Sequence, residues 1–378
     1  MRGWAAVPGA VAVVGCALLA CDGDSPVPDG GDRASAPDGR DAPALGPSRQ
    51  LDLVFVIDNS GTMREEQDAL GRAFPAFLEA LQAAPGGMPD LRIGIVSTSF
   101  GAGPTISLPE CSPLGDRGRF LVRPGCGLDP AVGGAFLTVD GQGRTNFSGS
   151  LPQVFSCLAA LGSKGCGYEH QLQSLRAAIA NPPMNPENRG FVRTDARLGI
   201  VILSDEDDCS GEPTAEFYSD LIPGQGVSLR CALLGHVCNG QAVPPMAGFE
   251  TSLSACAPYV RSSAERNSRL INVQEFADHV MAIKSGRPDN IVVSTIIGWN
   301  DSPDAKYGLI ERPAGSGAGL EIDLAPACIA SETGNAGPGV RLHAFALSFP
   351  HNTVHSICTG DLTPAMRDIG RKMAGMAN

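Results

Sequence analysis

The chain has 378 residues, a formal net charge of −12 and a pI near 4.9. An acidic surface repels phosphate backbones and anionic surfaces, so we expect no nucleic-acid partner. It favours cations and basic molecules as partners. Apolar residues make up 43% of the chain, which is enough for a large core. We expect one elaborated domain rather than several small ones.

The first twenty residues predict an export signal. Arg2 is the only basic residue before an apolar run that reaches Ala20 and is short for a membrane span. The sequence "LLAC", Leu18 to Cys21, resembles the lipobox of bacterial lipoproteins, which implies cleavage before Cys21 and lipidation of this cysteine. A second "xxGC" pattern ends at Cys16, but the apolar run continues beyond it. We expect membrane contact through the lipid anchor only.

A disordered linker is expected over residues 21–50. Its residues are mainly Asp, Gly, Pro, Ala and Ser, with little apolar surface to bury. The folded domain is then expected over residues 51–378. Three loop insertions are expected inside this domain, around residues 101–145, 206–264 and 300–338.

The cysteines predict disulfides. Removing Cys16 and Cys21 from the twelve leaves ten, an even number typical of an oxidising compartment. They are Cys111, Cys126, Cys157, Cys166, Cys209, Cys231, Cys238, Cys256, Cys328 and Cys358. Sequence does not fix the pairing, but proximity along the chain favours Cys111–Cys126, Cys157–Cys166 and Cys328–Cys358. A zinc cluster is disfavoured because the chain has no CxxC pair.

Apolar runs of strand length alternate with helical patterns. Strands are expected over residues 51–57, 91–98, 197–204, 290–298 and 341–349, and helices over residues 63–84, 149–161, 169–180, 273–284 and 363–376. This alternation predicts an α/β fold, with a doubly wound, mostly parallel central sheet, helices on both faces and disulfide-rich loop insertions. Such sheets bind ligands beyond the carboxyl ends of their strands, where "DNSGT" and "SDEDD" should meet.

The motif "DNSGT", Asp58 to Thr62, follows the first buried strand. It resembles the DxSxS/T signature of the von Willebrand factor A (VWA) fold, whose metal-ion-dependent adhesion site (MIDAS) uses this loop. Asp58, Ser60 and Thr62 match the motif, and Asp205 in "VILSD" matches the aspartate after the fourth strand. The resemblance implies a bound divalent cation, and oxygen ligands suit Mg²⁺, Ca²⁺ or Mn²⁺.

Two loops depart from the VWA pattern. The threonine of the second loop is replaced by Glu169 when the chain is counted back from the following helix. Glu169 could bind the cation directly, Thr145 in "GRTNF" could reach it from upstream, or neither could bind it. The third loop continues with Glu206, Asp207 and Asp208, which are further acidic candidates for the site. A solvated acidic turn is the alternative interpretation of Asp207 and Asp208.

Cysteine-rich chains with "DEDDCS" after the fourth strand resemble predicted lipoproteins of myxobacteria and related Deltaproteobacteria, a likeness that implies no activity. We expect a lipid-anchored protein of the cell envelope that binds a protein or carbohydrate ligand through the cation. One alternative is an extracytoplasmic metal-dependent hydrolase that uses the same acidic cluster. A second is a structural VWA domain without metal. No nucleophile motif places a catalytic Ser, His and Asp set, so an enzyme is not the main expectation.

Overall fold

The structure is a computed structural model, and it describes residues 50–101, 111–212, 225–243, 253–300, 308–313, 319–330 and 334–375. The expected signal peptide, Cys21 and all of the expected linker except Gln50 lie outside these residues. None of the helices in the described part is both long enough and apolar enough to cross a membrane.

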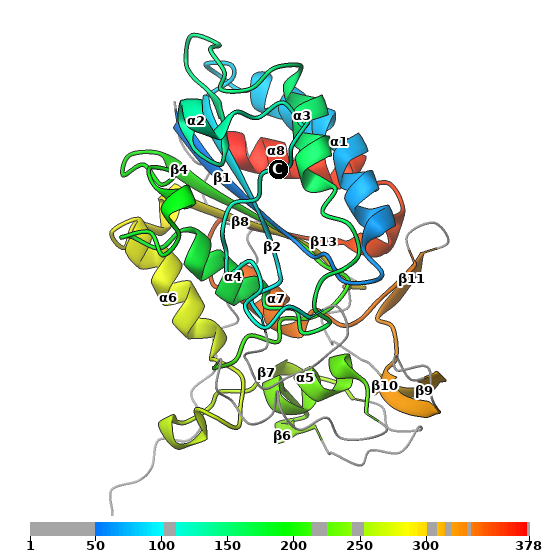
Figure 1. Cartoon of the computed structure of the whole chain (residues 1–378). Helices are drawn as coiled ribbons and strands as arrows, with labels where there is room; N and C mark the ends of the chain where they lie inside the picture. The colour runs from blue at the N-terminus through cyan, green and yellow to red at the C-terminus, as the bar shows by residue number, and fades with distance from the viewer. Residues whose placement is uncertain are drawn as a thin grey trace, which may run out of the picture. The chain divides into compact units, whose positions relative to one another are not determined.

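A six-stranded, mostly parallel sheet lies at the centre of a mixed α/β fold (Figure 1). Its spatial order is β13–β8–β4–β1–β2–β3, and only β3 runs antiparallel to its neighbour. The strands are β1 (Gln50–Ile57), β2 (Asp90–Ser97), β3 (Leu137–Val139), β4 (Arg197–Leu203), β8 (Ile291–Ile297) and β13 (Asn352–Ser356). In β4 and β8 every residue is buried, which explains their continuous apolar sequences.

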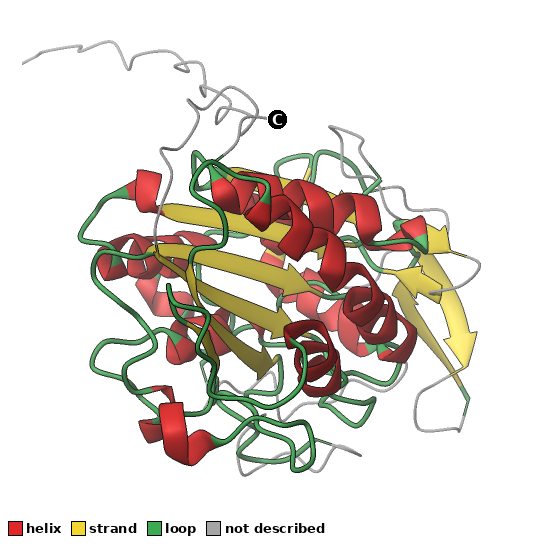
Figure 2. Cartoon of the chain, turned by 90° about the horizontal axis from the view of Figure 1, so that it is seen from above, coloured by secondary structure: helices red, strands yellow, loops and turns green. Residues whose placement is uncertain are grey.

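Helices cover both faces of this sheet (Figures 1 and 2). One face carries α1 (Arg64–Gln82), α3 (Leu151–Ala159) and α8 (Thr363–Ala374), and the other carries α4 (Gln171–Ala178), α6 (Val273–Ile283) and α7 (Val340–Leu347). Because successive strand residues point to opposite faces, Phe55 joins the first core and Val56 the second. In the first core the rings of Phe74 and Phe155 stack with centroids 3.7 Å apart.

Smaller elements lie in or beside the three expected insertions. They are α2 (Pro130–Gly133), α5 (Val227–Gly235), β5 (His236–Cys238), β6 (Gln241–Ala242), β7 (Ala257–Pro258), β9 (Leu309–Pro313), β10 (Leu320–Leu324), β11 (Cys328–Ala330) and β12 (Gly334–Ala336). Strands β9 and β10 form one antiparallel ribbon, and β11 and β12 form another.

The expected strand over residues 341–349 is wrong, because this segment is the helix α7. The carboxylate of Asp207 accepts hydrogen bonds from the backbone N–H groups of Arg341 and Leu342, and so caps the N-terminus of the helix. The edge strand is instead β13, which the sequence did not predict. A short apolar run does not distinguish a buried strand from a buried helix. The five expected helices are confirmed, each with ends shifted by at most a few residues.

Five disulfides join the ten cysteines, as Cys111–Cys166, Cys126–Cys157, Cys209–Cys231, Cys238–Cys256 and Cys328–Cys358. The expected pair Cys328–Cys358 is confirmed, whereas Cys111–Cys126 and Cys157–Cys166 are wrong. The helix α3 packs in the first core and brings Cys157 to Cys126, and Cys166 lies beyond the end of that helix. Five disulfides indicate an extracytoplasmic protein.

Replacing both Cys126 and Cys157 by alanine should lower the free energy of unfolding by about 3.5 kcal/mol, because this bond closes a loop of 31 residues. Urea denaturation of the variant and the parent measures the difference. Peptide mapping without reduction should recover Cys126 linked to Cys157 and Cys111 linked to Cys166. A recovered Cys111–Cys126 peptide would contradict the structure.

Candidate cation site

The candidate site lies at the carboxyl ends of the neighbouring strands β1 and β4. From β1 the chain moves outward to β2 and β3, and then returns to β4 on the other side of β1. A sheet of this kind forms its ligand-binding crevice where the strand order reverses. Asp58 follows β1 and Asp205 follows β4, and the N–H of Asp58 continues the pairing by donating to the carbonyl of Leu203 at 2.9 Å.

Asp58 is fully buried and holds its loop in a tight turn. Its Oδ1 accepts the N–H of Ser60 at 2.8 Å, and its Oδ2 accepts the hydroxyl of Ser204. The side chain of Gln67 in α1 donates to the carbonyl of Asp58 at 2.8 Å. The turn places Ser60 Oγ 3.4 Å from Thr62 Oγ1. Two hydroxyl oxygens and one carboxylate therefore lie together in one loop.

Glu169 and Asp205 bring carboxylates to this loop from two other segments. Glu169 is 1% exposed and accepts a hydrogen bond from the hydroxyl of Thr98 through Oε2, while Oε1 has no hydrogen-bond partner among the residues that the structure describes. Asp205 is 3% exposed and lies beside the hydroxyl of Thr62, and in the described part of the chain no hydrogen-bond partner reaches its Oδ1. Glu169 also lies beside Asp58. The structure thus brings together Asp58, Ser60, Thr62, Glu169 and Asp205.

These residues fit a hard divalent cation. Buried carboxylate oxygens without partners are costly, and a cation would satisfy both Glu169 Oε1 and Asp205 Oδ1. Carboxylate and hydroxyl oxygens are ligands that suit Mg²⁺, Ca²⁺ and Mn²⁺. In the described part of the chain, no group of three or more His, Cys, Asp or Glu side chains forms a metal site by itself. Hydroxyl and water oxygens would therefore have to complete the coordination.

The carboxyl groups of the cluster oppose one another's ionisation. Burial raises the pKa of Asp58, and burial followed by the charge of Asp58 raises the pKa of Glu169 and of Asp205 well above the usual range. Burial and then Asp58 raise the pKa of Glu206 to about 8. Burial also raises the pKa of Glu66 in α1 to about 7. A bound cation would reverse these shifts by favouring the charged forms.

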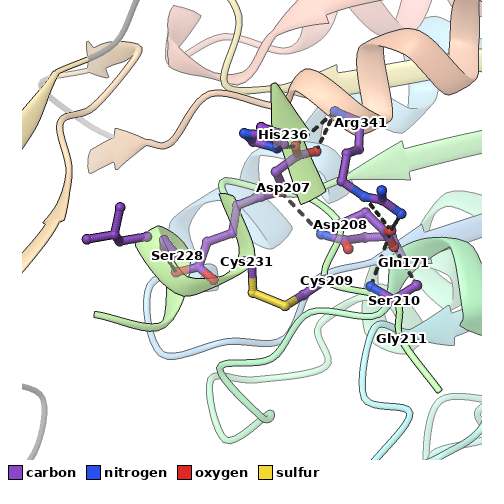
Figure 3. The surroundings of a disulfide bond; sticks show 12 residues. Gln171, Asp207, Asp208, Cys209, Ser210, Gly211, Ser228, Cys231, His236 and Arg341 are labelled. Atoms are coloured by element: carbon purple, nitrogen blue, oxygen red, sulfur yellow. Dashed lines mark hydrogen bonds and ion pairs between the residues drawn. A yellow bond between two sulfur atoms is a disulfide. The ribbon is translucent and has the colours of Figure 1, made fainter. Parts of the chain in front are cut away.

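Asp207 and Asp208 have partners of their own outside the cluster, and Figure 3 shows both aspartates beside Arg341. Asp207 caps α7 and lies 2.7 Å from Nε2 of His236. Asp208 accepts the guanidinium of the fully buried Arg341 at 2.9 Å and the N–H of Leu172, in the first turn of α4, at 3.0 Å. Asp207 and Asp208 are therefore neither ligands of the candidate cation nor part of a solvated acidic turn. Each of them instead holds the first turn of a helix. The disulfide Cys209–Cys231 follows them directly.

Thr145 also lies elsewhere, because it is exposed beside the edge strand β3 and its hydroxyl donates to the carbonyl of Phe147 at 3.0 Å. Two residues that the sequence analysis missed instead support the site. Thr98 follows β2 and donates to Glu169, and Ser204 follows β4 and donates to Asp58. Each of these residues directly follows an apolar strand, in "IVST" and in "VILS". This position in the sequence could have identified both as candidates for the site.

The cluster opens into a cleft of about 600 Å³, which we call the acidic cleft. Its described lining residues include Thr62, Glu65, Asp205 and Glu206, Ser228 of α5, and residues in or next to β9, β10, β11 and β12. Glu206 Oε1 accepts the hydroxyl of Ser228 in α5 at 3.1 Å. A ligand in this cleft would therefore lie next to the candidate cation site.

The substitution Gly165→Ala should weaken cation binding about tenfold. The N–H of Gly165 donates to the carbonyl oxygen of Asn59 at 2.7 Å, and an added Cβ would lie 2.6 Å from the same oxygen, so the loops that carry Asp58 and Glu169 must separate. Titration calorimetry with MgCl₂ measures the change. Gly61→Ala is the matched control, because a Cβ at Gly61 meets nothing within 4 Å. Equal affinities for the two variants would contradict the described packing.

Without a divalent cation, the free energy of unfolding should fall as the pH rises from about 4.5 to about 8. Glu206 has an ordinary pKa of 4.5 and a folded pKa of about 8, so the folded chain holds more protons than the unfolded chain between these values. Cation binding should release protons, and its affinity should rise with pH over the same window. Thermal unfolding with and without MgCl₂ tests both statements. A cation-free stability that rises over this window would refute them.

No protein-family model matches the chain, and no curated protein is similar to it in sequence. Its fold has distant similarity to solved structures. The open conformation of the pilus adhesin SpaC from Lactobacillus rhamnosus GG has 11% identity and a TM-score of 0.36, over 88% of this chain and 31% of the adhesin. Proximal thread matrix protein 1 from the mussel byssus has 10% identity and a TM-score of 0.34, over 87% of this chain and 50% of that protein. Human COPII-coat protein Sec24c has 11% identity and a TM-score of 0.34, over 87% of this chain and 33% of Sec24c. The chain spans half or less of each protein, and similarity at this level identifies neither a family nor a function.

Proposed function

We propose that the chain is an extracytoplasmic binding module of the VWA type that presents a divalent cation to a ligand. Asp58, Ser60, Thr62, Glu169 and Asp205 would hold the cation. The observation that carries this proposal is a pair of buried oxygens, Glu169 Oε1 and Asp205 Oδ1, for which the described residues supply no hydrogen-bond partner. The two carboxyl groups approach Asp58 from separate loops. The strand order supports a doubly wound arrangement, because it reverses at β1 and β4.

The ligand would complete the coordination from the side of the acidic cleft. Thr62 is exposed and Asp205 lines the cleft, so this is the side that a partner can reach. A carboxylate of a protein or an oxygen of a carbohydrate has suitable chemistry. Glu169 adds a negative charge where the VWA pattern has a neutral threonine, so the cation would attract a carboxylate less strongly. We place the module at the cell envelope, anchored through lipidated Cys21.

A metal-dependent hydrolase is the second candidate. The observation in its favour is the position of Glu206, whose carboxyl group lines the cleft and which, after burial and Asp58, contributes to the raised pKa of Glu169 and of Asp205. A carboxylate beside a cation can accept a proton from an attacking water. Metal-dependent turnover in a phosphoester and peptide screen, absent in Asp205→Asn, would favour this candidate over the binding module.

The cation is tested by titration calorimetry with MgCl₂, CaCl₂ and MnCl₂. We expect saturable binding of at least one of these ions, and we expect Asp58→Ala to abolish it because this carboxylate is central to the cluster. Asp278→Ala is the matched control, since it removes a carboxylate from the exposed surface of α6 and should leave binding unchanged. Absence of binding by the parent chain for all three ions would leave only a structural VWA domain without metal.

A further inference from the structure

A second pocket, with a volume of about 390 Å³, is lined by the first residues of α1 and by the segment that follows α3. These two helices lie side by side in Figure 1. We call this cavity the basic pocket, because its described lining contains three cationic side chains and one carboxylate, from Arg64, Arg123, Lys164 and Asp68. The net charge of the whole chain is −12, so the pocket has a local charge of the opposite sign.

The guanidinium of Arg123 is held in position without a counter-ion. Its Nη1 donates to the carbonyl of Cys157 at 3.0 Å and to the carbonyl of Ala160, at the C-terminal end of α3. A disulfide joins Cys157 to Cys126, which is three residues after Arg123. Among the described residues no carboxylate pairs with Arg123. Neutral carbonyl groups satisfy its N–H donors but leave its positive charge uncompensated, so it attracts an anion.

The other donors of the basic pocket have no bonded partners. In the described part of the chain, the side chains of Arg64, Ser163 and Lys164 form no hydrogen bond or ion pair, and both basic side chains are exposed. Asp68 is exposed as well and pairs with none of these groups, so it reduces the positive charge of the pocket without neutralising it. Two ammonium or guanidinium groups and one hydroxyl are thus available beside the fixed guanidinium of Arg123.

The surroundings of the basic pocket favour a small anionic group. A nucleic acid or an anionic membrane would also meet the acidic remainder of the surface, which repels extended polyanions. None of the described lining residues is aromatic, whereas pockets for small molecules are lined mainly by apolar and aromatic side chains. A single carboxylate needs only charged and hydroxyl donors, and these are the groups that the pocket contains.

We propose that the basic pocket binds an aspartate or glutamate side chain of a protein partner. Arg123 would supply a guanidinium that is already oriented, and Arg64 and Lys164 would approach the carboxylate from α1 and from the segment after α3. This inference goes beyond the proposed function, because the basic pocket requires no metal ion.

The basic pocket adjoins the candidate cation site through Gln67, which is one of its lining residues. Nε2 of Gln67 donates to the carbonyl of Asp58 at 2.8 Å and to the carbonyl of Gly162 at 3.0 Å. Its Oε1 accepts the N–H of Gly162 at 2.9 Å. A protein segment with two acidic residues would therefore fit both sites, with one carboxylate at the cation and the other in the basic pocket.

The probe is an uncharged-ended hexapeptide with two central glutamates between glycine and serine residues, compared with the same peptide carrying two glutamines. Titrations of the ¹⁵N-labelled chain are followed by NMR in EDTA. We expect the amide signals of Gly162 and Lys164 to shift saturably, with at least about fivefold higher affinity for the glutamate peptide. The double variant Arg64→Gln with Lys164→Gln should lose this preference. Arg72→Gln with Arg371→Gln should retain it, since this control changes the net charge equally at exposed residues outside the pocket lining.

Asp68→Asn provides a test by gain of affinity, which a damaged fold does not produce. Removal of this opposing carboxylate should tighten binding of the glutamate peptide about threefold. Asp278→Asn is the matched control, because it removes an equal charge from the exposed surface of α6 and should leave the affinity unchanged.

Three results would overturn the inference. The first is equal affinity for the glutamate and glutamine peptides, and the second is an equal effect of the pocket variants and their controls. The third is tighter binding of polygalacturonate than of the peptide, lost in the same double variant, which would assign the pocket to an acidic polysaccharide. Because the peptide titrations contain EDTA, their outcome is independent of the calorimetry that tests the proposed function.

Discussion

Mutual repulsion among buried carboxylates is the constraint on which the rest of this structure depends. At the ends of β1 and β4 the fold places Asp58, Glu169 and Asp205 together in a region with little access to water. Buried carboxyl groups that lie beside one another cannot all ionise without a counter-charge. Hydrogen-bond donors therefore surround these carboxylates. The hydroxyl of Thr98 donates to Glu169, and the hydroxyl of Ser204 and the N–H of Ser60 donate to Asp58. Two oxygens remain for which the described residues supply no donor.

The sequence predicted the parts that depend on local pattern. Continuous Val, Ile and Leu runs identified β1, β4 and β8, because strands covered on both faces have no polar alternation. Asp58 and Asp205 were predictable from them, since a polar residue directly after such a strand lies at the edge where the other strands end. Thr98 and Ser204 obey the same rule and could have been predicted in the same way.

Long-range contacts account for the features that the sequence could not predict. The helix α7 begins where it does because Asp207, which is 134 residues earlier in the chain, caps Arg341. The pairing of Cys111 with Cys166 spans 55 residues and depends on where α3 packs. Separation along the chain has little bearing on separation in space once a domain has folded.

The four consecutive acidic residues after β4 illustrate the same limit. In the sequence they form one block of charge, but the turn divides them between two environments. Asp205 and Glu206 line the cleft, whereas Asp207 and Asp208 anchor α7 and α4 through the backbone and through Arg341. Only two of the four acidic residues therefore belong to the site, and the other two position helices beside the sheet.

Two of the disulfides lie next to the loops of the candidate cation site. Cys166 lies three residues before Glu169, and Cys209 lies four residues after Asp205, so two covalent bonds close the segments that meet at the cluster. The geometry described above belongs to the oxidised chain. In a reducing environment these segments would lack both covalent links. Formation of these two disulfides would therefore fix the relative positions of the loops that carry Glu169 and Asp205, and with them the geometry of the proposed cation site.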